Sequence, residues 1–275
     1  MHSWLDGHVQ PTSRGIRVTI TATKITANRL LTALPQHEQR QFQSKAEQVE
    51  LPYNGILEDS GKPIRHVYFP TTGFIAMTTT NGVHPGLEVG LIGDEGMCGI
   101  ALVLGVNHSA VRATVQGKGT ALRMDAVQFR RLLEVCPALR LLLQRYAHVL
   151  MGQLMQSITC KRFHHLEARL ARLLLMLQDR AQLDPVHLTH EVLALRLGVR
   201  RAGVTNAAIA MQDRGLISYH RGDITFVDRA KLHSAACICY ATDNATYAAL
   251  LGRSIAKTPT PCGGGRQESD LDDSC

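Results

Sequence analysis

The sequence lacks the features that would mark a membrane protein or a secreted one. No run of about 18 consecutive apolar residues occurs, so a membrane-spanning helix is not expected. Asp6, Arg14 and Arg17 interrupt the first residues of the chain, which therefore have no apolar signal-peptide core. The seven cysteines are odd in number and scattered, which does not suggest a disulfide framework. We therefore expect a cytoplasmic protein that does not contact a membrane.

Common catalytic motifs are also missing. The chain has neither a G-x-S-x-G nucleophile motif nor a glycine-rich phosphate loop followed by Lys-Ser or Lys-Thr. His66, His84 and His108 stand on separate segments, without the clustered histidines and carboxylate of a metal-dependent enzyme, and no motif at His66 or His84 points to haem. We therefore expect no enzymatic activity.

Positive charge is concentrated in the second half of the chain. The net charge is +7 over 275 residues, a length sufficient for two domains with cores of their own. Residues 161–233 contain 12 Lys and Arg against 7 Asp and Glu, whereas residues 27–160 contain 12 against 10. A surface that binds DNA phosphates needs such an excess. Because moderately basic domains are common, the charge has meaning only together with a motif.

The segment 188–228 has the order of features of a helix, a tight turn and a second helix. Thr189 can cap the first helix by accepting a backbone N–H. Gly198 stands where the chain leaves that helix, a position that favours positive φ. The second helix opens with Arg200 and Arg201, and its apolar residues recur every three or four positions, as one buried face requires. These apolar residues are Val204, Ala207, Ala208 and Met211.

A hairpin follows the second helix, which ends at Gly215. Apolar and polar residues alternate on both sides of a turn at 221–223, so this part predicts two short strands. The whole segment has the pattern of a winged helix-turn-helix, whose second helix fits the DNA major groove. The alternative is a helical hairpin inside an ordinary core, with solvated arginines. The order of cap, turn glycine, basic helix start, terminal glycine and wing favours the DNA-binding module.

These residues resemble the C-terminal domain of the CRP/FNR family of bacterial transcription regulators. That family carries a pattern of the type L-T-x-x-x-[LIV]-A-x-x-[LIV]-G-[VC]-S-R-E-T-V-x-R, with G-L-I and a wing behind it. The likeness extends more weakly over 27–250, and is closest to a branch that reads L-G-V-R-R-x-x-V-T and ends in C-x-C-Y, here 237–240. The matching residues are Leu188-Thr189, Ala194, Leu197-Gly198-Val199, Arg200-Arg201-Ala202-Gly203-Val204-Thr205-Asn206 and Gly215-Leu216-Ile217.

The resemblance assigns roles to individual residues of the second helix. Arg201 stands where the family has a base-reading arginine, so we expect it to bind guanine O6 and N7. Asn206 replaces a second arginine, and its amide suits adenine N6 and N7. Ala202 replaces the usual glutamate, so the operator sequence of the best-known members is not carried over. The residues expected to contact phosphate are Arg200, Thr189 and Thr205, with Arg221 on the wing.

The sequence pattern of the first half of the chain is typical of a small β-domain. Asn28 can cap a helix that we expect to run to about Val49. Short β-prone runs then alternate with turn signals between Glu50 and Met124, which suggests a β-roll or jelly roll. The resemblance specifies this as a cyclic-nucleotide-binding-like roll. The expected strands lie at 67–69, 74–77, 87–92, 111–115 and 121–124.

A long helix is predicted between the two halves, from Pro137 to about Arg162. Its apolar arc is so wide that the helix must bury two sides. One side can pack on the roll, and the other on a second copy, as in a two-stranded coiled coil. A fully buried helix in a monomer is the alternative. We favour a homodimer, because dimeric DNA readers place two recognition helices about 34 Å apart.

These patterns together predict an α+β fold. The parts are an N-terminal arm (1–26), a cyclic-nucleotide-binding-like β-roll (27–135), a dimerisation helix (136–165), a winged helix-turn-helix domain (166–250) and a disordered tail (251–275). The expected partners are double-stranded DNA with a palindromic site, a second copy, RNA polymerase and an unidentified small-molecule effector.

The constellation that binds cyclic nucleotides in this family is missing or displaced. It needs a Gly-Glu pair for the ribose and an Arg-Ser or Arg-Thr pair for the phosphate. Here Gly99 is followed by Ile100, and Ser109-Ala110 stands where the arginine pair belongs. Glu95 or Arg112 could complete a shifted pocket. We expect a regulator that does not respond to cyclic AMP; a nucleotide-gated activator and a protein-interaction module on the same fold remain alternatives.

Three cysteines raise the question of a metal or redox site. Cys237-x-Cys239 with Cys160 could bind a soft metal. A C-x-C pair alone is a weak signal, and no third and fourth ligand stand at zinc-like spacing. Residues 1–97 contain no cysteine, which argues against the N-terminal iron–sulfur cluster of the family's oxygen sensors. We therefore expect no metal and no cofactor, with the cysteines packed as small apolar residues, and interpret His164-His165 as a solvated basic face or a pH-sensitive hinge.

Overall fold

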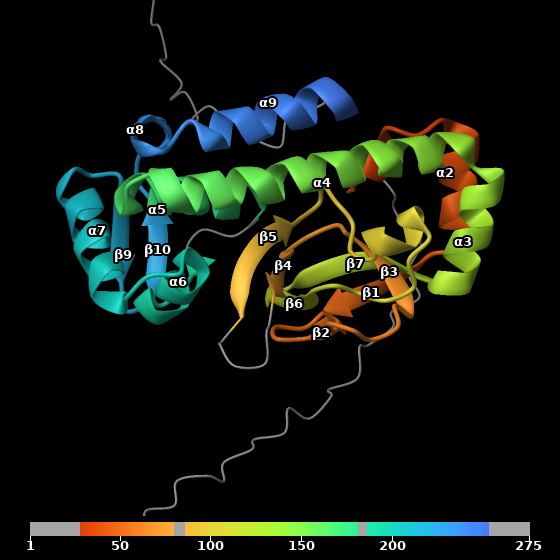
Figure 1. The fold of residues 1–275 in the computed structure, drawn as a ribbon, viewed down its shortest axis with the longest axis horizontal. Helices are drawn as coiled ribbons and strands as arrows, with labels where there is room; N and C mark the ends of the chain where they lie inside the picture. Colours follow the sequence, from red (N-terminus) through yellow and green to blue (C-terminus); the bar gives the residue numbers. More distant parts are fainter. Residues whose placement is uncertain (1–27, 80–85, 181–185, 253–275) are drawn as a thin grey trace, which may run out of the picture.

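The computed structural model describes residues 28–79, 86–180 and 186–252 (Figure 1). The expected arm 1–26 and the expected tail beyond Gly252 lie outside these residues. The first half contains α1 (Arg29–Thr32), α2 (Gln36–Gln43), β1 (Glu47–Leu51), β2 (Ile56–Glu58), β3 (His66–Pro70), β4 (Phe74–Thr79), β5 (Leu87–Ile92), the 3₁₀ helix η2 (Ile100–Leu104), β6 (Arg112–Gly117), β7 (Gly119–Asp125) and α3 (Ala126–Val135). The second half contains α4 (Pro137–Phe163), α5 (Leu166–Arg180), β8 (Val186–His187), α6 (His190–Leu197), α7 (Arg201–Asp213), β9 (Ile217–His220), β10 (Asp223–Phe226), α8 (Arg229–Ala235) and α9 (Cys239–Leu251).

The β-strands of the first half form a roll of two antiparallel sheets, which confirms the predicted fold class. One sheet has the strand order β1-β7-β3, and the other β2-β6-β4-β5. Each of the expected strands is present, and β5 has the predicted bounds. The alternating burial of Val49, Glu50 and Leu51 shows why β1 is a strand, with one side in the core and the other in solvent.

The predicted helix from Asn28 to about Val49 is wrong in its extent. Pro35 separates α1 from α2, and α2 ends at Gln43, before β1. The cap at Asn28 is confirmed: its side-chain oxygen accepts from the backbone N–H groups of Leu30 and Leu31. The Asn28 amide also donates to the carbonyls of Pro70 (2.9 Å) and Gly96 (3.0 Å), so the cap fixes α1 on the roll.

The long helix α4 crosses the whole molecule and is covered on two sides within one chain. Its inner side packs into the core of the roll through Leu139, Leu143 and Tyr146. The C-terminal helix α9 lies along α4 (Figure 1), and its Tyr247 and Leu251 join the same core. The predicted packing of α4, on the roll on one side and on a second copy on the other, did not include this contact with α9. A stripe of α4 remains exposed through Met151, Met155 and Ile158.

The second half has the predicted helices and hairpin, together with a strand that was not predicted. The sheet order is β8-β10-β9, so β8 adds an outer strand to the wing. A separate core forms between α5, α6, α7 and α8, where Leu193, Val204 and Met211 are buried. Within the described residues, no helix is both long enough and apolar enough to cross a membrane.

Candidate nucleic-acid interface

Local sequence signals position the two helices of the helix-turn-helix. Thr189 is the N-cap of α6, and its hydroxyl accepts from the backbone N–H of Val192 (3.3 Å). Gly198 ends α6 with φ 65°, a left-handed conformation that glycine adopts without steric cost. The chain then turns at Val199, and Arg200 takes the N-cap position of α7. The predicted cap and turn are thus confirmed.

Helix α7 has one buried face and one exposed face. Its apolar residues at the predicted positions are buried against α5 and α6. Arg201, Ala202, Asn206 and Ile209 are exposed. Ala202, Asn206 and Ile209 are spaced by four and three residues, so they lie on one side of the helix. Together with Arg201 they form a solvent-facing surface that begins at the N-terminal end of α7. A helix of this size with a free face is what the major groove accommodates.

Three exposed arginines of the helix-turn-helix and its wing are free of carboxylate partners among the described residues. Arg200, Arg201 and Arg221 are exposed, and none of them forms an ion pair there. By contrast, Arg196 pairs with Glu88 and Arg214 pairs with Glu167. The structure therefore separates structural arginines from arginines whose charge is available to a ligand, and those predicted to contact DNA fall in the second group.

Thr205 lies at the boundary between α7 and α6. It is partly buried, and its hydroxyl contacts His190 Nδ1 (3.0 Å) and the carbonyl of Arg201 (3.2 Å). The His190 ring stacks on Tyr219 of the wing, with 4.3 Å between ring centroids, and the Tyr219 hydroxyl donates to the carbonyl of Leu188. This chain of contacts ties α7 to α6 and to the wing. His190 and Tyr219 were not predicted from sequence, because their contact forms only in the folded domain.

The surroundings of His190 favour the neutral form of its imidazole. Burial lowers its pKa, and the positive charge of Arg201 lowers it further. A neutral ring can accept a hydrogen bond from Thr205 and can stack on Tyr219 without the cost of burying a charge. The position of Arg201 and the protonation state of His190 are therefore linked.

The wing turns tightly and exposes an arginine at its tip. His220 pairs with Asp223 across the loop Arg221–Gly222, and both loop residues have positive φ, 50° and 95°. Turns of this kind follow the twist of a hairpin. A Cβ at Gly222 would lie 2.9 Å from the ring of His187, so the position requires glycine. Positive φ is unusual for an arginine, and here the residue that adopts it has an exposed side chain.

The residues that could complete a shifted nucleotide pocket are engaged elsewhere. Glu95 is buried and pairs with Arg180 of α5 at 2.7 Å. Arg112 pairs with Asp59 at 2.8 Å on the surface of the roll. The Ser109 hydroxyl donates to Glu58 (2.6 Å). The Glu95–Arg180 pair connects the roll with the half that contains the helix-turn-helix.

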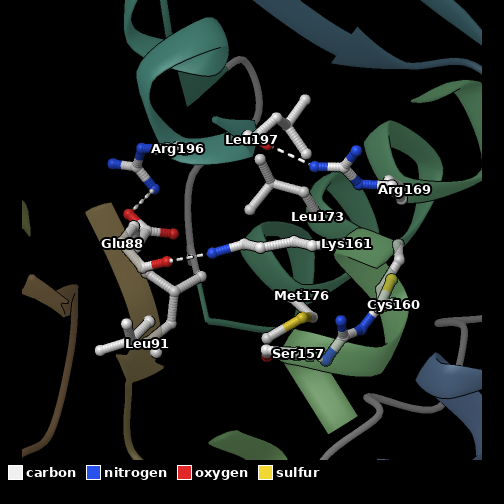
Figure 2. Close-up of a pocket in the computed structure, with 13 residues that line it drawn as sticks. Glu88, Leu91, Ser157, Cys160, Lys161, Arg169, Leu173, Met176, Arg196 and Leu197 are labelled. Carbon is white, nitrogen blue, oxygen red and sulfur yellow. Dashed lines mark hydrogen bonds and ion pairs between the residues drawn. The ribbon is translucent and has the colours of Figure 1, made fainter. Parts of the chain in front are cut away.

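Residues that form a second connection between the two halves line a small cavity (Figure 2). Arg196 of α6 pairs with Glu88 of β5 at 3.1 Å, and the Lys161 ammonium donates to the carbonyl of Glu88 at 3.0 Å. Burial raises the pKa of Glu88, and the charge of Arg196 opposes this. The cavity measures about 60 Å³, whereas pockets for small-molecule ligands span roughly 300–1,000 Å³. It is too small for a nucleotide.

Comparisons with known proteins agree with this architecture. Residues 168–235 match the Crp-like helix-turn-helix domain. No curated protein matches the chain. The fold is similar to FixK2 of Bradyrhizobium japonicum (TM-score 0.60, 13% identity, 70% of this chain and 98% of that one). It is also similar to the c-di-GMP-responsive global regulator CLP of Xanthomonas campestris (0.57, 12%, 70% and 100%) and to a CRP/FNR family transcriptional regulator of Thermus thermophilus (0.52, 17%, 69% and 98%). The predicted resemblance is confirmed.

Proposed function

Because residues 168–235 are a Crp-like helix-turn-helix on the fold of CRP/FNR regulators, we propose that this protein regulates transcription as a homodimer bound to a two-fold symmetric DNA site. The observation that carries the proposal is the exposed face of α7, with free arginines at its start and on the adjoining wing. Such a protein acts in the cytoplasm, where bacterial DNA is, and needs no catalytic group of its own.

The contacts divide into base contacts and phosphate contacts. Arg201 reaches the guanine edge, and Asn206, one turn further along the exposed face, reaches a second base. Arg200 at the N-cap of α7, Thr189 at the N-cap of α6 and Arg221 on the wing contact phosphates. The hydroxyl of Thr205 is already engaged with His190, so we assign Thr205 to positioning of α7 instead of the predicted phosphate contact.

Dimerisation is assigned to the exposed stripe of α4. Met151, Met155 and Ile158 follow each other at helical spacing of four and three residues, and between 49% and 70% of each side chain is exposed. A run of exposed apolar residues on one helix face is unfavourable in water and is typical of an interface. Two α4 helices packed along this stripe form the two-stranded arrangement that holds two recognition helices on one side of the DNA.

The proposed regulator does not respond to cyclic AMP. Glu95 and Arg112 are held by ion pairs, and opening either pair to admit a ligand costs the energy of that pair. An effector of other chemistry would need a different site. The cyclic-nucleotide-gated alternative would require Glu95 to exchange Arg180 for a ribose.

Binding measurements with single variants test the DNA contacts. Arg201→Ala is expected to weaken binding to the cognate duplex by about 1–3 kcal/mol and to relax specificity at one base pair. Arg221→Ala should weaken binding to all duplexes alike and reduce the slope of log K against log salt by about 1. Arg131→Ala, an exposed arginine on α3, is the matched control. An equal loss for Arg201→Ala on cognate and random DNA would contradict its base-reading role.

A further inference from the structure

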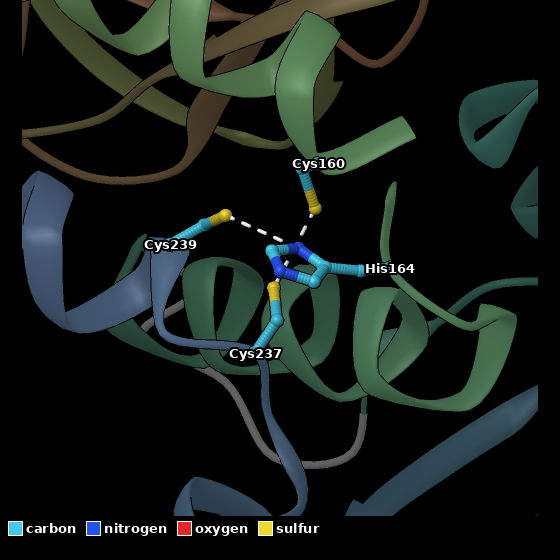
Figure 3. A group of neighbouring side chains, drawn as sticks. All are labelled: Cys160, His164, Cys237 and Cys239. Atoms are coloured by element: carbon cyan, nitrogen blue, oxygen red, sulfur yellow. Dashed lines mark hydrogen bonds between the residues drawn. The ribbon is translucent and has the colours of Figure 1, made fainter. Parts of the chain in front are cut away.

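Four potential metal ligands from distant parts of the chain meet at the end of α4 (Figure 3). Cys160 and His164 stand on the last turn and the C-cap of this helix. Cys237 lies in the loop between α8 and α9, and Cys239 is the first residue of α9. All four ligand atoms lie within 4.8 Å of one another. The side chains point toward a common centre (Figure 3).

The distances within the cluster match a tetrahedral metal site. Cys160 Sγ is 3.5 Å from Cys237 Sγ, and Cys239 Sγ is 3.4 Å from His164 Nδ1. A zinc ion with Zn–S bonds of about 2.3 Å holds its ligand atoms about 3.5–3.8 Å apart. Two sulfurs joined in a disulfide would be separated by about 2.05 Å. The other pairs of ligand atoms are up to 4.8 Å apart. Small shifts of these atoms toward the centre would complete the tetrahedron.

The surroundings of the cluster suit a closed, negatively charged metal centre. The three cysteines are buried and His164 is partly buried. Three thiolates and a neutral imidazole around Zn²⁺ carry a net charge of about −1, which needs donors and positive charge nearby. The Gln156 amide donates to Cys239 Sγ at 2.9 Å, and the Arg172 guanidinium interacts electrostatically with Cys160. Such outer groups orient the ligands of a metal site.

We propose that Cys160, His164, Cys237 and Cys239 bind one structural zinc ion. Thiolate and imidazole donors in tetrahedral geometry are typical of zinc, and four protein ligands leave no open position for catalysis. Binding displaces the thiol protons into solvent, so affinity rises with pH. Because Cys160 and His164 lie far from Cys237 and Cys239 in the sequence, the C-x-C pair alone could not reveal the site. The additional sequence signal is Cys160-x-x-x-His164, which stands at the C-terminal end of α4.

The location gives the ion a mechanical role. His164 and His165 form the break between α4 and α5, where the chain passes from the roll half into the DNA-binding half. A zinc ion at this break ties the end of α4 to the α8–α9 loop, and the Cys237 N–H already donates to the carbonyl of Ala168 on α5 (3.3 Å). The ion thereby fixes the angle between α4 and α5. An effect of the zinc ion on DNA affinity rests on the proposed function, whereas the binding of the ion itself does not.

Metal analysis of the purified full-length protein, kept reduced, tests the site. We expect one zinc ion per chain, and its replacement by Co²⁺ should give thiolate-to-cobalt charge-transfer and tetrahedral d–d bands. Cys239→Ser and His164→Ala should lose these bands, whereas Cys136→Ser, which alters a buried cysteine outside the cluster, should keep them. Gln156→Ala should lower zinc affinity about 10–100-fold without changing the ligand set.

The wild-type protein provides readouts that do not depend on whether a variant folds. Chelation should lower its melting temperature, and zinc alone should restore it. The absence of zinc and of cobalt bands from folded, reduced protein would overturn the proposal. Formation of a Cys160–Cys237 disulfide with no metal bound at any stage would overturn it in favour of a redox pair. Metal binding without any sequence-specific DNA binding would leave this proposal standing and contradict the proposed function instead.

Discussion

The junction between the two halves and the surface of the helix-turn-helix use their charged side chains in opposite ways. At the junction, charges turn inward: Glu95 with Arg180, and Glu88 with Arg196, are buried pairs. In the helix-turn-helix, Arg200, Arg201 and Arg221 turn outward and are free of carboxylate partners among the described residues. A charge that is satisfied within the fold contributes to architecture, and one that is left to solvent is available for recognition. The buried pairs at the junction therefore support the architecture, and the three outward arginines are the charges that we propose for DNA recognition.

The largest loss of folding stability is expected from breaking a buried ion pair at the junction. Glu95→Ala removes the partner of Arg180, whose side chain is only 2% exposed. An uncompensated buried charge typically costs about 3–5 kcal/mol. Thermal or denaturant unfolding should show this loss. Asp59→Ala removes the surface partner of Arg112 and should cost less than about 1 kcal/mol. Equal losses for the two variants would contradict the distinction between buried and surface pairs.

A second effect concerns the exposed apolar stripe of α4. Met155→Lys places a charge on the stripe, where it would face its own copy in a dimer, and should raise the dimer dissociation constant at least about tenfold, or 1.4 kcal/mol. Val135→Lys changes an equally exposed apolar residue on α3 and should leave the dimer intact. Sedimentation equilibrium measures both. A monomeric wild-type protein, or dimers unaffected by Met155→Lys, would rule out this interface.

The smallest effect is a pH dependence inside the DNA-binding half. The folded-state pKa of His190 lies below its usual value of 6.5, first because of burial and then because of Arg201. The neutral ring therefore contributes stability that is fully present above pH 6.5 and is lost as the pH falls through the lower, folded-state pKa. His190→Gln, which can still bond Thr205, should flatten this part of the stability–pH curve. A curve identical to that of the wild type would show that other groups cause the slope.

Local signals made the helix-turn-helix predictable from sequence. Thr189, Gly198 and Gly215 determine helix ends through neighbouring backbone groups, and the wing turn is set by two adjacent residues. The extents of α1 and α2 were mispredicted, because the pairing of β1 with β7 overrides the helical pattern before Val49. Strand β8 was not predicted, since its two residues gain structure only from β10.

The contacts between distant elements could not be predicted from the sequence. Cys160 and Cys237 are 77 positions apart, and the sequence raised their grouping only as a weak possibility, because no local pattern shows that the two residues meet. The same holds for Glu88 and Arg196, whose residue types fit equally well on a solvated surface. Long-range pairing of this kind depends on the packing of whole helices and sheets, which periodicity does not specify.

Selection of bound sequences from random duplex DNA by the purified protein, with and without cyclic AMP, tests the central claim most directly. We expect a two-fold symmetric motif that is recovered without nucleotide and that Arg201→Ala degrades at one position in each half-site. Recovery of no motif, or of a motif only when cyclic AMP is present, would contradict it.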